Sequence, residues 1–156
     1  MVTKDCLEWL RYSNMDIDAA EQLYSLQQNP RHRPIEIILY HCQQGAEKAL
    51  KAFMVQNGKF PPKTHELQEL RLICLQWNSK FENSRIIKHC AYLDPFSVVI
   101  RYPKHNISFD SAQAFRGLNS AKRIFNFVCQ QLDIINFSPK QQPQPSRRLK
   151  SARHNP

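Results

Sequence analysis

The stretch HCQQGAEKALKAF, His41 to Phe53, decides the fold of this chain. It belongs to a stripe of apolar residues spaced by four and three, which is one face of an α-helix: Ile35, Leu39, Cys42, Ala46, Ala49 and Phe53. The middle of the stripe consists of small side chains, which let a neighbouring helix approach closely. Gly58 ends the pattern. The spacing therefore predicts the central helix of a helical bundle.

A second row runs along the other side of the same helix and holds polar side chains: His41, Gln44, Lys48 and Lys51. Because these residues also recur at intervals of three and four, their side chains point the same way. The row is either a solvated surface or part of a site. Glu47 and Lys51 are four residues apart, which is typical of a helix surface ion pair worth a few tenths of a kcal/mol.

Four further helical segments follow from periodicity and capping signals, and no strand-like alternation appears. The first helix covers Lys4 to Gln28, and the third covers His65 to Trp77 behind Thr64 as N-cap. A shorter helical piece is expected near Asn83 to Leu93. The last helix begins at Asp110, with Gln113 completing a capping box, and its stripe is Ala114, Leu118, Ala121, Phe125, Val128, Leu132 and Ile135.

Pro95 and Pro103 interrupt the helical pattern, so residues 93–110 are expected to form a long loop with a functional role. The predicted fold is all-α: an antiparallel up-and-down four-helix bundle with a short extra helical piece and a long loop before the last helix.

Length and charge set the domain organisation. A chain of 156 residues fits one domain with a real core, here residues 1–137. Residues 138–156 hold five basic residues and no acid, which leaves +4 of the net charge of +9 on residues 1–137. Their Pro, Gln, Ser and Arg content predicts a disordered basic tail. The tail is either an electrostatic arm for nucleic acid or a solvated extension.

Location and cofactors follow from absences in the sequence. No apolar run is long enough for a membrane span, and the amino terminus has neither a secretory signal nor a typical transit peptide, so we expect a cytoplasmic protein without membrane partners. The five cysteines are scattered through apolar patterns, which is typical of reduced core thiols. No metal-ligand spacing accompanies them, and we expect neither metal nor cofactor.

Three motifs in order resemble the HEPN domain family over about residues 4 to 135. They are HCQQGAEKALKA at 41–52, KTHEL at 63–67, and Arg101-Tyr102-Pro103 ahead of a long final helix. The resemblance implies a four-helix bundle that is usually a homodimer and is often paired with a small nucleotidyltransferase of the MNT type. Members include nucleotide-binding modules, toxins of toxin–antitoxin pairs, and ribonucleases.

The ribonuclease branch of this family uses an Arg followed by four to six residues and a His, as phosphate clamp and proton-transfer group. The matching segment here is Arg101 to His105, with three residues between, so it is one residue short. Arg85 to His89 has the same spacing, which shows that spacing alone is weak support. Tyr102 precedes a proline and is therefore expected to avoid helical geometry. This shortened spacing favours binding over cleavage.

The candidate site residues follow from these motifs. Arg101 and His105 are the candidate catalytic pair. A nucleotide or phosphate would be bound by Arg101, Tyr102, Lys104, His105, Lys63, His65, His41 and Lys48. Structural roles remain open for several: Arg101 as a capping arginine or the partner of Asp94, Tyr102 as a packing anchor, and His65 as a first-turn residue. Lys63 and Arg101 are expected at different ends of the bundle, so the eight binding residues are not expected to form a single pocket.

Three functions are left open by the sequence. The first is a non-catalytic nucleotide-binding and interaction module, acting with a nucleotidyltransferase in a toxin–antitoxin-like pair. The second is a metal-independent HEPN ribonuclease toxin that cleaves RNA with Arg101 and His105. The third is a dimeric scaffold without a ligand. There is no glycine-rich phosphate loop and no nucleophile elbow, so the chain is not expected to be a nucleotidyltransferase itself.

Overall fold

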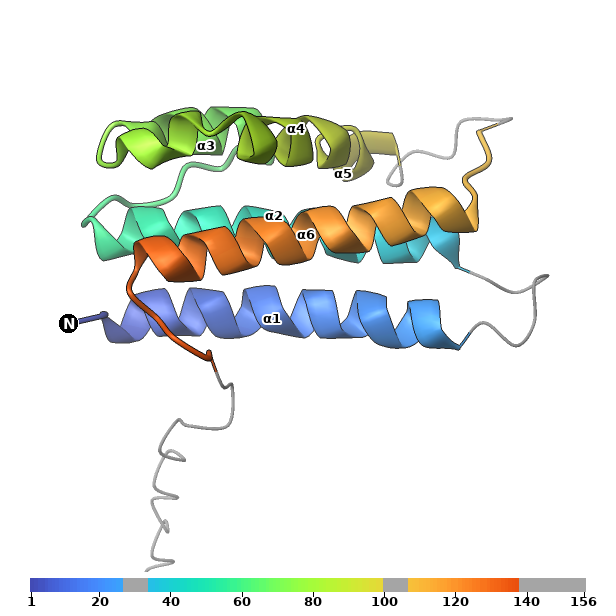
Figure 1. Cartoon of the computed structure of the whole chain (residues 1–156), viewed down its shortest axis with the longest axis horizontal. Helices are drawn as coiled ribbons and strands as arrows, with labels where there is room; N and C mark the ends of the chain where they lie inside the picture. The colour runs from blue at the N-terminus through green and yellow to red at the C-terminus, as the bar shows by residue number, and fades with distance from the viewer. Residues whose placement is uncertain (27–33, 100–106, 138–156) are drawn as a thin grey trace, which may run out of the picture.

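The computed structural model describes residues 1–26, 34–99 and 107–137, and these residues form helices and no strand. The long helices α2 and α6 lie side by side in the middle, α1 covers one side of them, and the short helices α3, α4 and α5 cover the other (Figure 1). The elements are α1 (Lys4–Ser25), α2 (Ile35–Gln56), α3 (Leu67–Leu75), the 3₁₀ turn η2 (Ser79–Glu82), α4 (Ser84–Leu93), α5 (Phe96–Val99) and α6 (Ser111–Gln131).

The helix directions confirm the predicted all-α bundle. Along the chain α1, α2, α4 and α6 alternate in direction, and α3 is the extra short helix between α2 and α4 (Figure 1). No helix of the described residues is long and apolar enough to cross a membrane.

The predicted apolar stripe of α2, from Ile35 to Phe53, is buried along its whole length and is the centre of the core. It is called the seam of α2 below. Gly45 lets α1 approach closely, because a Cβ there would lie 2.7 Å from Cγ1 of Ile17. At the same contact the Ser13 hydroxyl donates a 2.6 Å hydrogen bond to the Gly45 carbonyl. Small residues thus place α1 and α2 close together, as the sequence predicts.

All five cysteines are buried free thiols, as expected from their apolar surroundings. Burial raises the pKa of the Cys42 and Cys90 thiols to about 12, so these side chains are protonated and pack as small apolar groups.

Helix ends follow local sequence signals at two places. Gly58, just after α2, has φ 72°, a left-handed conformation that glycine adopts without strain. Asp110 and Gln113 form the predicted capping box of α6: the Gln113 amide donates to the Asp110 carboxylate at 2.7 Å, and the Asp110 amide donates to the Gln113 side chain at 2.9 Å.

The third helix differs from its prediction at its start. It begins at Leu67 rather than His65, and Thr64 is not its N-cap; the Thr64 hydroxyl accepts from the Glu66 amide before the helix. The capping group is instead the Asp94 carboxylate, which accepts from the Leu67 amide at 2.5 Å and the Gln68 amide at 3.3 Å. The cap therefore comes from the end of α4, which lies beside the start of α3.

Two other expectations are corrected. Residues 96–99 of the predicted loop form the helical turn α5, and Asp94 has helical φ −51° and ψ −44° although Pro95 follows it. Burial of Phe96 against Tyr92, with ring centroids 5.6 Å apart, outweighs the proline preference. Ile135 is 88% exposed because α6 ends at Gln131. Residues 27–28, the rest of the loop at 100–106 and the tail lie outside the described residues.

Candidate functional site

The structure tests only half of the sequence-predicted site. Arg101, Tyr102, Lys104 and His105 lie outside the described residues, so their roles stay predictions. The described elements on either side of them, the end of α5 and the start of α6, lie at the end of the bundle where α2 begins (Figure 1). The turn between α2 and α3 starts at the other end and runs back along α2 as far as His65, which contacts Glu47. Lys63 and His65 belong to that turn.

A groove of about 1130 Å³ lies between α1, α2 and the turn at 57–66, and it collects three of the predicted residues. Lys48 projects into it from α2, while Lys63 and His65 come from the turn. The side chain of Lys63 is exposed, and that of His65 is 45% exposed. These groups place two cations and an imidazole around one concave surface, a combination suited to phosphate oxygens.

The remaining walls of the groove combine aromatic and apolar side chains with further charged groups, namely Lys51, Lys59 and the two carboxylates Asp5 and Glu8 of α1. Trp9 and Tyr12 come from α1, three residues apart and therefore on one face, and Phe60 comes from the turn with 89% of its surface exposed. The Lys51 ammonium lies 6.0 Å from the centre of the Trp9 ring. Exposed aromatic rings beside cations can stack on a nucleobase while the cations meet its phosphates.

His41 does not line the groove but is linked to it through α1. The Asp16 carboxylate lies 2.8 Å from Nδ1 of His41 and also pairs with the Lys48 ammonium. Asp16 thus holds Lys48 in place at the groove and ties the predicted polar row of α2 to α1. His41 is therefore part of the interface between α1 and α2.

Glu47 is the centre of a buried polar network, so its predicted role in a surface pair is wrong. The side chains of Glu47 and Lys51 are only 6% and 7% exposed, and their ion pair measures 2.8 Å. Nδ1 of His65 lies 3.1 Å from the same carboxylate, and Gln43 donates to it at 3.3 Å. Helical spacing could not reveal this burial, which comes from α1 and the turn covering that side of α2.

The network also fixes the turn that carries the groove residues. Gln43, which is fully buried, donates a 2.9 Å hydrogen bond from its amide to the His65 carbonyl. Backbone and imidazole of His65 are therefore both held by α2. The segments HCQQGAEKALKA and KTHEL are therefore in direct contact in the structure. Gln43 and Glu47 of the first segment bind His65 of the second.

Asp16 and Tyr12 are the site residues that sequence reasoning missed. Asp16 is next to the buried Ile17 and resembles any surface acid in the sequence, so only the position of α2 reveals its two cationic partners. Tyr12 could have been linked to Trp9 by their spacing of three. Across residues 1–26, 34–99 and 107–137 no group of three or more His, Cys, Asp or Glu is placed to hold a metal ion.

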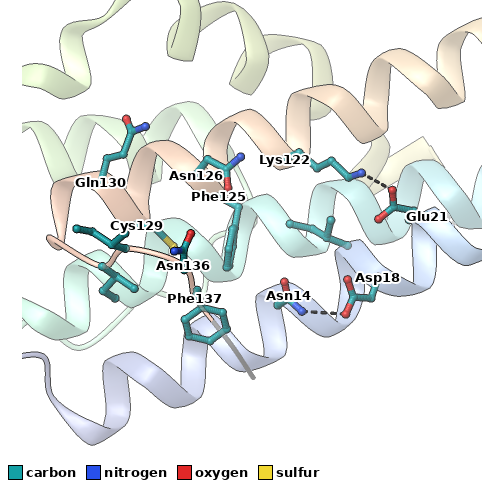
Figure 2. A pocket seen from close by; sticks show the side chains of 13 residues that line it. Asn14, Asp18, Glu21, Lys122, Phe125, Asn126, Cys129, Gln130, Asn136 and Phe137 are labelled. Carbon is teal, nitrogen blue, oxygen red and sulfur yellow. Dashed lines mark hydrogen bonds and ion pairs between the residues drawn. The ribbon is translucent and has the colours of Figure 1, made fainter. Parts of the chain in front are cut away.

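A second hollow, of about 580 Å³, lies between α1, α6 and the segment after α6 (Figure 2). Its charged groups already have partners: Lys122 pairs with Glu21 at 2.5 Å, and Asp18 accepts from Asn14 at 2.8 Å. The Phe137 ring lies 5.6 Å from Phe125 at one side of it. The groove at α1 and α2 also holds two acids, Asp5 and Glu8, but it adds Lys59 and Lys63, which have no acidic partner among the described residues. The hollow offers no such lysine and is therefore less suited to a phosphate.

Comparison with known proteins identifies the fold and then the family. Two solved structures are similar: "ST0689, an archaeal HEPN homologue" (22% identity, TM-score 0.63, 81% of this chain and 97% of the other) and TT1696 from Thermus thermophilus (20% identity, TM-score 0.68, 83% and 99%). No curated protein matches. The HEPN domain family model matches residues 6–132, most of the chain and all of its helices from Cys6 onward. The protein belongs to the HEPN domain family.

Proposed function

We propose that this protein is a nucleotide-binding module whose ligand occupies the groove between α1, α2 and the turn at 57–66. The observation that carries the proposal is the meeting of Lys48, Lys63 and His65 with Trp9 and Tyr12 around one concave surface. The nucleobase stacks on the aromatic rings, and the phosphates extend toward the cations. Of the four predicted binding residues outside 100–106, Lys48, Lys63 and His65 line the groove and His41 does not.

The proposal includes partners as well as a ligand. Following the resemblance, the protein acts as a homodimer beside a small nucleotidyltransferase, in a toxin–antitoxin-like pair in which the partner supplies the chemistry. Arg101, Tyr102, Lys104 and His105 form a second phosphate-binding element. An adjacent gene for a nucleotidyltransferase, copurification of the two proteins, and sedimentation of this chain as a dimer are the expected observations. A monomer that retains no such partner would contradict this part.

Nucleotide binding is tested by calorimetry and tryptophan fluorescence with the four nucleoside triphosphates. Trp9 and Trp77 are the two tryptophans of the chain, so a Trp77→Phe background makes the emission report on Trp9 alone. We expect saturable quenching of Trp9. Trp9→Leu weakens binding by about tenfold through lost stacking, on the order of 1.4 kcal/mol, and Lys63→Ala weakens it several-fold.

The matched control is Lys80→Ala, which removes another exposed lysine, on η2 and outside the lining of the groove. Equal affinities of Lys63→Ala, Lys80→Ala and the unchanged protein would contradict the groove as the site. The ribonuclease alternative has its own outcome: growth arrest on expression, with RNA cleavage that disappears in His105→Ala, would overturn a non-catalytic role.

A further inference from the structure

The helices α4 and α6 carry basic residues and no acid. Within Ser84–Leu93 and Ser111–Gln131 there is no Asp or Glu, while four exposed cations are distributed over both helices: Arg85, Lys88, Arg116 and Arg123. This side of the bundle is distinct from the groove at α1 and α2, because α4 packs on α6 in the layer on the other side of α2 (Figure 1).

A hollow of about 550 Å³ runs between these two helices. Arg85 and His89 line it from α4, and Arg123, Asn126 and Gln130 line it from α6. None of the residues that line it is acidic. Guanidinium groups and side-chain amides provide hydrogen-bond donors, and the amides also provide acceptors.

Arg85, Lys88, Arg116 and Arg123 have no acidic partner within the described part of the chain, whereas Arg11, Lys48, Lys51 and Lys122 each have one. Lys48 is neutralised by Asp16 and Lys51 by Glu47, and Lys122, on another face of α6, is neutralised by Glu21. The charge of Arg85 and Arg123 is therefore available to an external anion.

The side chains also influence one another across the hollow. His89 has Nδ1 3.0 Å from the Ser120 hydroxyl on α6. Burial, followed by the positive charges of Arg123 and Arg116, lowers the pKa of His89. Burial is the main cause of this lowered pKa, and the two guanidinium groups add to it, which agrees with positive potential at the hollow.

The positions of the cations indicate an extended ligand rather than a single phosphate. Arg116 and Arg123 are seven residues apart on α6, which places them on one side of the helix roughly 10.5 Å apart along its axis. Arg116 stacks over the Tyr92 ring at 4.1 Å, which holds its guanidinium at the surface. Arg85 and Lys88 run along the neighbouring helix, so the positive charge forms a band instead of a cluster.

We propose that the hollow between α4 and α6 is a second binding surface, which anchors the phosphodiester backbone of a single-stranded nucleic acid through Arg85 and Arg123, with Arg116 and Lys88 extending the contact. The amides of Asn126 and Gln130 hydrogen-bond to sugar hydroxyls, which favours RNA over DNA. This surface is independent of the nucleotide groove and requires no chemistry from the chain.

The test is fluorescence anisotropy with a labelled uridine oligonucleotide and its deoxyribose counterpart, using the full chain over a salt series. Arg85→Gln/Arg123→Gln is expected to weaken RNA binding by about tenfold at low salt and to reduce the slope of log K against log salt by about 1.4. The DNA oligonucleotide is expected to bind more weakly. Both arginines are exposed, so the double variant retains the fold, which its circular dichroism checks.

The matched control is Lys4→Gln/Lys80→Gln, which removes the same charge from exposed positions on α1 and η2 and leaves the tail unchanged. The control is expected to bind RNA like the unchanged protein. Equal losses in both double variants would show that only net charge matters and would overturn the proposal, as would unchanged binding in the arginine variant. Equal affinity for a poly-glutamate peptide would overturn the assignment to nucleic acid.

A second readout separates direct contact from a structural effect. NMR titration of His89 is expected to show a higher pKa when RNA is bound, because phosphates offset the repulsion from Arg123 and Arg116. An unchanged His89 pKa at saturating RNA would contradict binding in this hollow. Nucleotide binding by the α1 and α2 groove is measured separately with Lys63→Ala, so the two proposals fail independently.

Discussion

Glu47 shows how burial changes the meaning of a common residue pair. A glutamate and a lysine four residues apart on a solvated helix contribute little, but here the carboxylate has Lys51, His65 and Gln43 around it inside the fold. A buried charge that loses its partner remains without compensation, and this is costly. The pair therefore positions the turn that carries the groove residues as well as stabilising it.

We predict that Lys51→Met lowers the free energy of unfolding by about 3 kcal/mol, because it leaves the Glu47 carboxylate without its ammonium partner. The double variant Glu47→Gln/Lys51→Met is expected to lose less than the sum of the two single variants, since it removes both charges. Urea denaturation measures all three free energies. Additive losses would contradict coupling between the two side chains.

The matched control is the exposed pair of Glu8 and Arg11, whose side chains are 41% and 28% exposed. Arg11→Met is expected to change the free energy of unfolding by less than about 1 kcal/mol, as is typical for surface ion pairs. A loss as large as that of Lys51→Met would show that burial does not distinguish the two pairs.

Elements whose signals are local can be predicted from the sequence, and elements that depend on distant residues cannot. The seam of α2 and the Asp110–Gln113 capping box are each written within one helix, and both predictions are confirmed. The start of α3 depends on Asp94, which is 27 residues from Leu67, so the prediction of the nearer Thr64 as its cap is wrong. The turn α5 forms because Phe96 is buried, which overrides the effect of Pro95.

The Asp94 cap gives a direct test of this account of α3. Asp94→Ala is expected to lower the free energy of unfolding by about 1 to 2 kcal/mol, because the Leu67 and Gln68 amides lose their acceptor. Asp94→Asn keeps an acceptor oxygen and removes a charge whose burial raises the pKa of the Asp94 carboxyl, so it should cost less. Thermal unfolding followed by circular dichroism compares the variants.

The control for this cap is Thr64→Ala, which removes the hydroxyl that the sequence predicts at the helix start. Since that hydroxyl bonds only a backbone amide before the helix, the expected loss is smaller than for Asp94→Ala. A larger loss of unfolding free energy in Thr64→Ala than in Asp94→Ala would show that Thr64 is the cap.

The connectivity of the bundle decides which of the described site residues meet. The turn after α2 and the chain between α5 and α6 start from opposite ends of the helical stack, as expected for an up-and-down arrangement (Figure 1). Lys63 and His65 are predicted from the KTHEL motif and Lys48 from the polar row of α2, and all three line one groove. The aromatic partner Tyr12 needs the packing of α1 on α2, which periodicity alone does not specify.

The same architecture gives the molecule two faces of different character. On the α1 and α2 side, Lys48 is paired with Asp16 and Lys51 with Glu47, and aromatic rings line the groove beside Lys63. On the α4 and α6 side, the described cations lack acidic partners. A small-molecule site with shaped walls and an extended surface for a polyanion are the two functions that these faces support best.

The most direct measurement is a two-dimensional ¹H–¹⁵N NMR titration of the full chain with ATP. We predict saturable shifts of the Trp9 indole resonance and of the Tyr12, Lys48 and Lys63 amides, while the indole of Trp77 serves as internal reference and stays in place. Shifts that are absent at saturating nucleotide, or that occur only away from α1, α2 and the turn at 57–66, would contradict the groove as a nucleotide site.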